Sequence, residues 1–148
     1  MNAKRYNNAP IVVTESNQEI KKKYDRAKNL AEVTMRRMQR ICCKQYDKWS
    51  DDESRTYQTL GNRYFLLMAI SYTAHADIVK GASCKSESRR RAHRHLNAYR
   101  MGLIAARHYD EMRASKWSEF WSHHIDEVPA DWRTRMLERI EEERELGN

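Results

Sequence analysis

The sequence contains little glycine and proline, with four and two residues respectively among 148. These residues mark the turns of multi-stranded sheets, so their scarcity argues against a fold of many short strands and favours long helices. Of three cysteines, Cys42 and Cys43 are adjacent and do not readily bridge each other, so no disulfide framework is expected. The cysteine content is typical of a reduced, cytoplasmic protein.

A long hydrophobic segment and motifs of known mechanism are also lacking. The longest apolar stretch, residues 64–70, is far shorter than the roughly 20 residues that span a bilayer, and no signal-peptide pattern opens the chain. We therefore expect no membrane association. There is no glycine-rich phosphate loop, no Gly-x-Ser-x-Gly elbow and no Cys-x-x-Cys pair, which favours a protein that is not an enzyme and needs no cofactor.

Charge, by contrast, is abundant and unevenly distributed. Lys and Arg outnumber Asp and Glu by 28 to 21, which gives a net charge of +7 at pH 7. Residues 1–49 carry +7 and residues 82–116 carry +6, whereas residues 117–148 carry −5. A basic body with an acidic end is typical of a protein with an anionic partner, of head-to-tail assembly, or of an acidic segment that covers the chain's own basic surface. Helix-end preferences alone also produce such a pattern.

Hydrophobic periodicity predicts an all-α fold, because apolar side chains recur every three or four residues along most of the chain. We expect an antiparallel helical bundle of three long helices, followed by one or two shorter C-terminal helices. A single helical domain over residues 16–148 would follow an extended arm over residues 1–15. The expected helices cover residues 16–48, 51–80, 86–114, 116–125 and 129–146.

Several residues mark the expected helix ends. Ser16 with Glu19, and Ser50 with Glu53, have the spacing of a capping box, in which a serine and a glutamate cap each other's backbone amides. Gly81 suits the position after a helix, where a positive φ is needed. Pro129 fits the first turn of the last helix, whose inward side chains would be Trp132, Met136 and Ile140.

The second helix is apolar on all sides around residues 64–70. Such a segment must be buried on more than one face. It is therefore expected either as the central helix of the bundle or as the contact surface of a homo-oligomer.

The third helix carries the densest positive charge. Its inward face would be formed by Ala92, Leu96, Tyr99, Leu103 and Ala106, with Asn97 and His108 projecting outward. Guanidinium groups present planar forks of donors that suit phosphates and carboxylates. The candidate binding residues are Lys85, Arg89, Arg90, Arg91, Arg94, Arg100 and Arg107.

The leading hypothesis is that this surface binds nucleic acid through the phosphate backbone, without reading bases. An alternative of nearly equal weight is a protein-interaction module or inhibitor that grips an acidic partner protein, as a small viral or phage accessory factor would. A weaker alternative is capture of an anionic nucleotide between helices. A charged helix face is also often simply solvated.

The six histidines predict no metal site. A helical metal pair needs ligands three or four residues apart, and no two histidines have this spacing, nor is there a Glu-x-x-His motif. His75 lies on an inward face and is expected to be a hydrogen-bonded core residue. His123 and His124 could form at most an adventitious site with Asp126 and Glu127.

Overall fold

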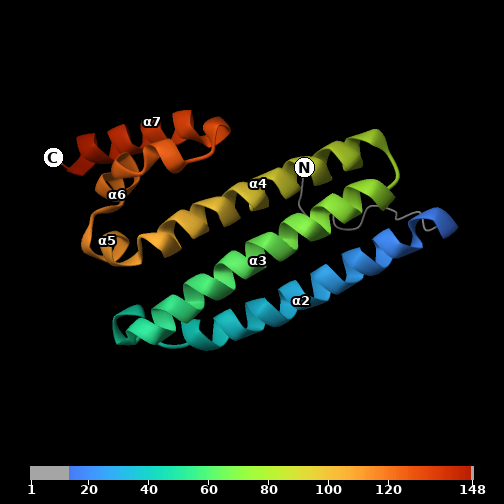
Figure 1. Cartoon of the computed structure of the whole chain (residues 1–148), viewed down its shortest axis with the longest axis horizontal. Helices are drawn as coiled ribbons and strands as arrows, with labels where there is room; N and C mark the ends of the chain where they lie inside the picture. The colour runs from blue at the N-terminus through green and yellow to red at the C-terminus, as the bar shows by residue number, and fades with distance from the viewer. Residues whose placement is uncertain (1–13, 148) are drawn as a thin grey trace. The chain divides into compact units, whose positions relative to one another are not determined.

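The protein's structure, a computed structural model, describes residues 14–147. The elements in this range are helical, so the predicted all-α fold of three long helices and shorter C-terminal helices is confirmed (Figure 1). The predicted arm over residues 1–15 lies almost wholly outside the described residues. The elements are η1 (Glu15–Asn17), α2 (Gln18–Cys42), η2 (Tyr46–Lys48), α3 (Asp51–Ile78), α4 (Ala82–Arg107), α5 (Tyr109–Ala114), α6 (Trp117–His123), η3 (Ile125–Glu127) and α7 (Ala130–Gly147).

The chain divides into two compact units, the first ending at Leu96 and the second beginning at Asn97. The boundary falls within α4, so residues 82–96 belong to the first unit and residues 97–107 to the second. The sequence predicts a single domain over residues 16–148, and this stays a prediction.

In the first unit, α2 packs along α3 through the small side chains of its inner face. The buried residues of α2 recur every three or four positions, which is the predicted stripe. These residues are Tyr24, Ala27, Ala31, Thr34 and Met38. The three in the middle of the stripe are small and let the two helices approach closely there, whereas Tyr24 and Met38 at its ends are large.

Helix α3 contacts both of the other long helices of this unit, as expected of a central helix. Its His75 lies with its ring 5.5 Å from that of Tyr24 on α2, and its Nδ1 is 2.6 Å from the Ser88 hydroxyl on α4. Residues 64–68 of α3 are half-buried. Assembly of a homo-oligomer through this segment stays a prediction.

The predicted cap of α3 and the predicted turn glycine are confirmed. The Ser50 hydroxyl accepts a hydrogen bond from the Glu53 amide at 3.1 Å, and the Glu53 carboxylate accepts one from the Ser50 amide at 3.1 Å. Gly81 has a φ of 99°, a conformation that favours glycine. The capping box predicted at Ser16 is wrong, because α2 begins at Gln18 and the Thr14 amide instead donates to the Asn17 side chain at 2.6 Å.

The first helix ends at Cys42, earlier than the predicted residue 48. The chain folds back there because the Trp49 indole donates to the Lys44 carbonyl at 3.0 Å and its ring contacts those of Tyr46 and Tyr57. No glycine or proline lies near Cys42, so the sequence pattern did not predict that the helix ends there.

The third helix begins at Ala82 and ends at Arg107, whereas residues 86–114 were predicted. His108 leaves the helical conformation, with φ −116° and ψ 38°, and a separate short helix, α5, follows it. No glycine or proline marks this break. At the break, the ring of His108 stacks on that of His124, and Tyr109 is buried.

The second unit has a core of large side chains. Phe120, Val128, Ile104 and Ile140 are each at most 2% exposed, and Trp121 packs among them. Helix α6 supplies the aromatic residues, and α7 covers them with Ile140, Trp132 and Met136, the inward residues predicted for the last helix.

Candidate functional site

The predicted basic surface of α4 is partly neutralised by the protein's own carboxylates. Glu87 accepts hydrogen bonds from Arg90 at 2.7 and 2.8 Å and from Arg91 at 3.1 Å. The Arg90 guanidinium, with help from Arg91, lowers the pKa of Glu87 below its usual value. Arg107 lies 3.2 Å from Glu127. These three arginines are therefore not the open array that the sequence predicted.

The remaining predicted residues divide into two kinds. Lys85 donates to the Ala76 carbonyl at 3.0 Å and so has a structural contact. Arg89, Arg94 and Arg100 are exposed, and no carboxylate of residues 14–147 pairs with them. Their guanidinium groups are available to an anionic partner.

The inward face predicted for α4 changes side along the helix. Ala92 is buried as expected, but Leu103 and Ala106 are exposed. Asn97, predicted to face outward, is completely buried and donates to the Asp131 carboxylate at 2.9 Å. The buried face changes because the helix packs within the second unit from residue 97 onward, where its neighbours are different.

A second basic face, which the α4 prediction did not include, lies on α2. Arg26, Arg37 and Arg40 are exposed and fall within about 60° of one another around the helix axis, at about 100–160° from the middle of its buried face. No carboxylate of the described residues pairs with these three arginines. The first unit thus carries unpaired arginines on two of its helices.

The groove along the second half of α4 is less suited to an anion. It has a volume of about 570 Å³ and is lined by Arg100, Arg107, Leu103, Pro129 and Glu127. The carboxylate of Glu127 already lies against Arg107 and would repel a phosphate. The weaker hypothesis of nucleotide capture therefore finds no support in this groove.

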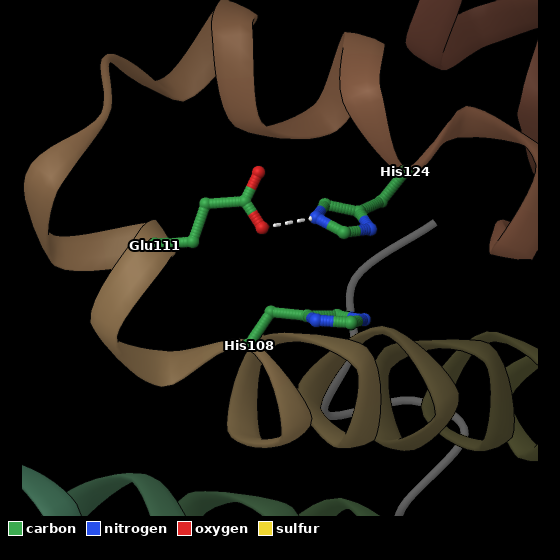
Figure 2. A group of neighbouring side chains, drawn as sticks. All are labelled: His108, Glu111 and His124. Carbon is green, nitrogen blue, oxygen red and sulfur yellow. Dashed lines mark hydrogen bonds and ion pairs between the residues drawn. The ribbon is translucent and has the colours of Figure 1, made fainter.

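A cluster of histidines and glutamates forms in the second unit (Figure 2). His108 follows the end of α4, Glu111 lies on α5, and His124 follows α6. Figure 2 shows the two imidazole rings lying one above the other, with the Glu111 carboxylate directed toward His124. The ring centroids of His108 and His124 are 4.0 Å apart, and their planes differ by 22°.

Two carboxylates bracket the His124 ring. Its Nε2 lies 2.6 Å from Glu111 Oε2, and its Nδ1 lies 2.8 Å from Glu127 Oε2. The same Glu127 oxygen lies 3.2 Å from His108 Nε2. The exposed side chain of His123 contacts the other oxygen of Glu111 at 2.7 Å.

These contacts determine the charge of the cluster. Burial disfavours the charged form of His124, but the hydrogen bonds to Glu111 and Glu127 outweigh it and raise the pKa of His124 above its usual value. The hydrogen bonds from His124 in turn lower the pKa values of Glu111 and Glu127. Without a ligand, the cluster is a network of ion pairs.

The donor atoms are also those of a metal centre. His108, Glu111 and His124 each offer a ligand atom, and these atoms all lie within 4.8 Å of one another. The histidine spacing within single helices predicted no metal site, but these three residues come from different elements. Of the adventitious set named from the sequence, Glu127 contacts His124 and His123 contacts Glu111.

The sequence does contain a signal for this cluster. His108-Tyr109-Asp110-Glu111 and His124-Ile125-Asp126-Glu127 repeat one pattern, His-x-Asp-Glu. A histidine and a glutamate three residues apart lie on the same side of a helical turn. The repeat indicates two carboxylate–imidazole pairs, but only the fold brings them together.

His75 has the predicted structural role. It is 4% exposed and hydrogen-bonded to Ser88. Burial, together with Lys28 and Arg91, lowers its pKa below the usual value, so the ring is neutral at pH 7. The three cysteines are free thiols, and Cys42 and Cys43 are exposed.

Comparison with known proteins gives no relative. No protein-family model matches the sequence, and neither curated proteins nor solved structures give a match. Within residues 14–147, no helix combines the length and apolar character needed to cross a membrane. The function must therefore be inferred from the side chains described above.

Proposed function

We propose that the first unit binds nucleic acid through its phosphate backbone. The observation that carries this proposal is the set of exposed arginines that pair with no carboxylate of the described residues: Arg26, Arg37 and Arg40 on α2, and Arg89 and Arg94 on α4. An arginine engaged with its own fold has little to gain from a phosphate, whereas an unpaired guanidinium can donate two parallel hydrogen bonds to one.

The overall charge of this unit supports the same function. Up to Leu96 the chain has 20 Lys and Arg against 10 Asp and Glu, while from Asn97 it has 8 against 11. The excess positive charge attracts a polyanion and releases its counterions on binding. Such contacts position the protein on nucleic acid but read no sequence.

Binding is best tested by fluorescence anisotropy with single- and double-stranded DNA and RNA oligonucleotides at 50 and 200 mM salt. We expect affinity to fall by about ten-fold or more between the two salt concentrations, because each neutralised phosphate adds roughly 0.9 to the logarithmic salt slope on duplex DNA. The double variants Arg37→Glu/Arg40→Glu and Arg89→Glu/Arg94→Glu should weaken binding further and reduce that slope.

The matched control is Arg135→Glu on α7, an exposed arginine of the second unit. It changes the net charge in the same direction and should alter affinity much less than one substitution in either pair. Each double variant changes the net charge by twice as much as Arg135→Glu, so a loss for Arg135→Glu of about half that of a double variant, on a logarithmic scale, would mean that only net charge matters and would contradict the proposed surface. An acidic protein retrieved by pull-down at 200 mM salt, with no oligonucleotide bound, would favour the alternative of a protein-interaction module.

A further inference from the structure

We propose that His108, Glu111 and His124 bind one divalent transition-metal ion. This inference does not depend on nucleic-acid binding, because all three residues lie in the second unit. Two imidazole nitrogens and a carboxylate oxygen lie within 4.8 Å of one another, and rotation of the His108 ring would bring them around an ion at bond lengths of about 2.0–2.2 Å.

The outer contacts of the two rings identify the ligand atoms. His124 Nδ1 and His108 Nε2 both contact Glu127 Oε2, at 2.8 and 3.2 Å. His124 Nε2 is then the nitrogen left for the ion, beside Glu111 Oε2, and His108 supplies one ring nitrogen as the third ligand. Metal-binding histidines usually donate their other N–H to a carboxylate, which fixes the tautomer and the ring orientation. Here Glu127 has that role for His124, and it contacts His108 as well while the two rings are stacked.

Glu127 is itself held in place. Its second oxygen, Oε1, lies 3.2 Å from the Arg107 guanidinium. The positioning carboxylate is therefore oriented from both sides, by an arginine and by two imidazoles. Such support holds the His124 ring in place before an ion binds, as expected of a built site and not of a chance group of surface histidines.

The arrangement without metal indicates what the ion displaces. A proton lies between His124 Nε2 and Glu111 Oε2, which are 2.6 Å apart, and a bound cation would take its place between the same two atoms. Because in-plane lone pairs of stacked rings do not converge, His108 must turn out of the stack. Its side chain is 33% exposed and lies at the break between α4 and α5.

The ligand set selects the class of metal. Imidazole nitrogens suit Zn²⁺ and Fe²⁺, whereas Mg²⁺ and Ca²⁺ prefer oxygen ligands only. Three protein ligands leave at least one coordination position for water or another small ligand. We therefore expect an open site with an exchangeable fourth ligand.

The test is equilibrium dialysis and calorimetry of the full chain with Zn²⁺, with anaerobic Fe²⁺ and with Mg²⁺. We expect one Zn²⁺ or Fe²⁺ per chain and no Mg²⁺. His108→Gln, Glu111→Gln and His124→Gln should each weaken Zn²⁺ binding by at least about 100-fold, and Glu127→Gln by roughly 10- to 100-fold. His93→Gln, an exposed histidine of the first unit, should leave the affinity unchanged.

Adventitious binding by other side chains is the main competing explanation, because the exposed thiols of Cys42 and Cys43 also attract Zn²⁺. The proposal would be overturned if the three ligand variants bound Zn²⁺ with unchanged affinity. It would also be overturned if Cys43→Ser lost the one equivalent of bound Zn²⁺. A second measurement on the unmodified chain covers the case in which a variant fails to fold. One equivalent of Zn²⁺ should shift the imidazole NMR signals of His108 and His124 and leave His75 unshifted; the reverse pattern would equally refute the site.

Discussion

The two units of the chain differ in the size of the side chains that they bury. The first buries many small or polar side chains, such as Ala27, Ala31, Thr34, Ser71 and His75, beside larger ones such as Leu60 and Ile78. The second is filled with large apolar ones, including Phe120, Trp121 and Ile140. Long helices bury enough surface by approaching closely along their length, whereas short helices need bulky side chains to exclude water.

The surroundings of histidine in the two units also shift its pKa in opposite directions. His75 is enclosed among helices with Ser88 as its hydrogen-bond partner, and burial keeps it neutral. His124 is placed between two carboxylates, which raise its pKa and so favour its charged form. The same side chain therefore acts as a packing residue in one unit and as a charged or ligand residue in the other, because its neighbours differ.

The sharpest test of the difference in packing is truncation of the aromatic core. Phe120→Ala should lower the free energy of unfolding by about 3–5 kcal/mol, because it removes a large side chain that is 1% exposed and leaves a cavity. Urea denaturation followed by circular dichroism measures the effect. Trp117→Ala, on the same helix but 36% exposed, is the control and should cost roughly 1 kcal/mol or less. Equal costs would mean that the second unit lacks the predicted core.

The first unit should instead be sensitive to enlargement. Ala27→Leu adds three carbon atoms where the side chain is 4% exposed, and we expect a cost of about 1–3 kcal/mol from the forced separation of α2 and its neighbours. Asn29→Leu, at an exposed position of the same helix, should change stability by less than about 0.5 kcal/mol. Tolerance of leucine at residue 27 would indicate a loosely packed interface and weaken the contrast between the units.

The smallest expected effect is the pH dependence of the two histidines. The lowered pKa of His75 contributes stability that is present above its unfolded value of about 6.5 and is lost as the pH falls below it. The raised pKa of His124 contributes stability that is present below 6.5 and is lost as the pH rises through the folded value. Neither slope can exceed about 1.4 kcal/mol per pH unit for one proton.

Histidine NMR titration in the presence of EDTA separates the two contributions. We expect His75 to titrate below 6.5 and His124 above it. In urea denaturation, His75→Gln should flatten the loss of stability on the acid side, and His124→Gln the loss on the basic side. Identical titration midpoints for the two rings would show that burial does not lower the pKa of His75 and the carboxylates do not raise that of His124.

Local sequence patterns predicted much of the first unit. The stripe of α2, the Ser50–Glu53 cap, the positive φ of Gly81 and the buried His75 all depend on neighbours a few residues away. The pairing of Glu87 with Arg90 and Arg91 was equally local, at spacings of three and four residues, and it could have been predicted from the same rule. Local geometry is fixed by the helix itself, so a sequence is enough to determine it.

By itself, then, the sequence determined the helical class, the long helices of the first unit and the excess of positive charge there. Only the tertiary structure decided that α4 ends at Arg107, that Asn97 is buried, and that His108, Glu111 and His124 meet. These features join residues from different elements, and periodicity within one helix carries no information about which helix will lie opposite. The physical reason is that burial and pKa depend on the atoms that surround a side chain, and packing supplies most of those atoms.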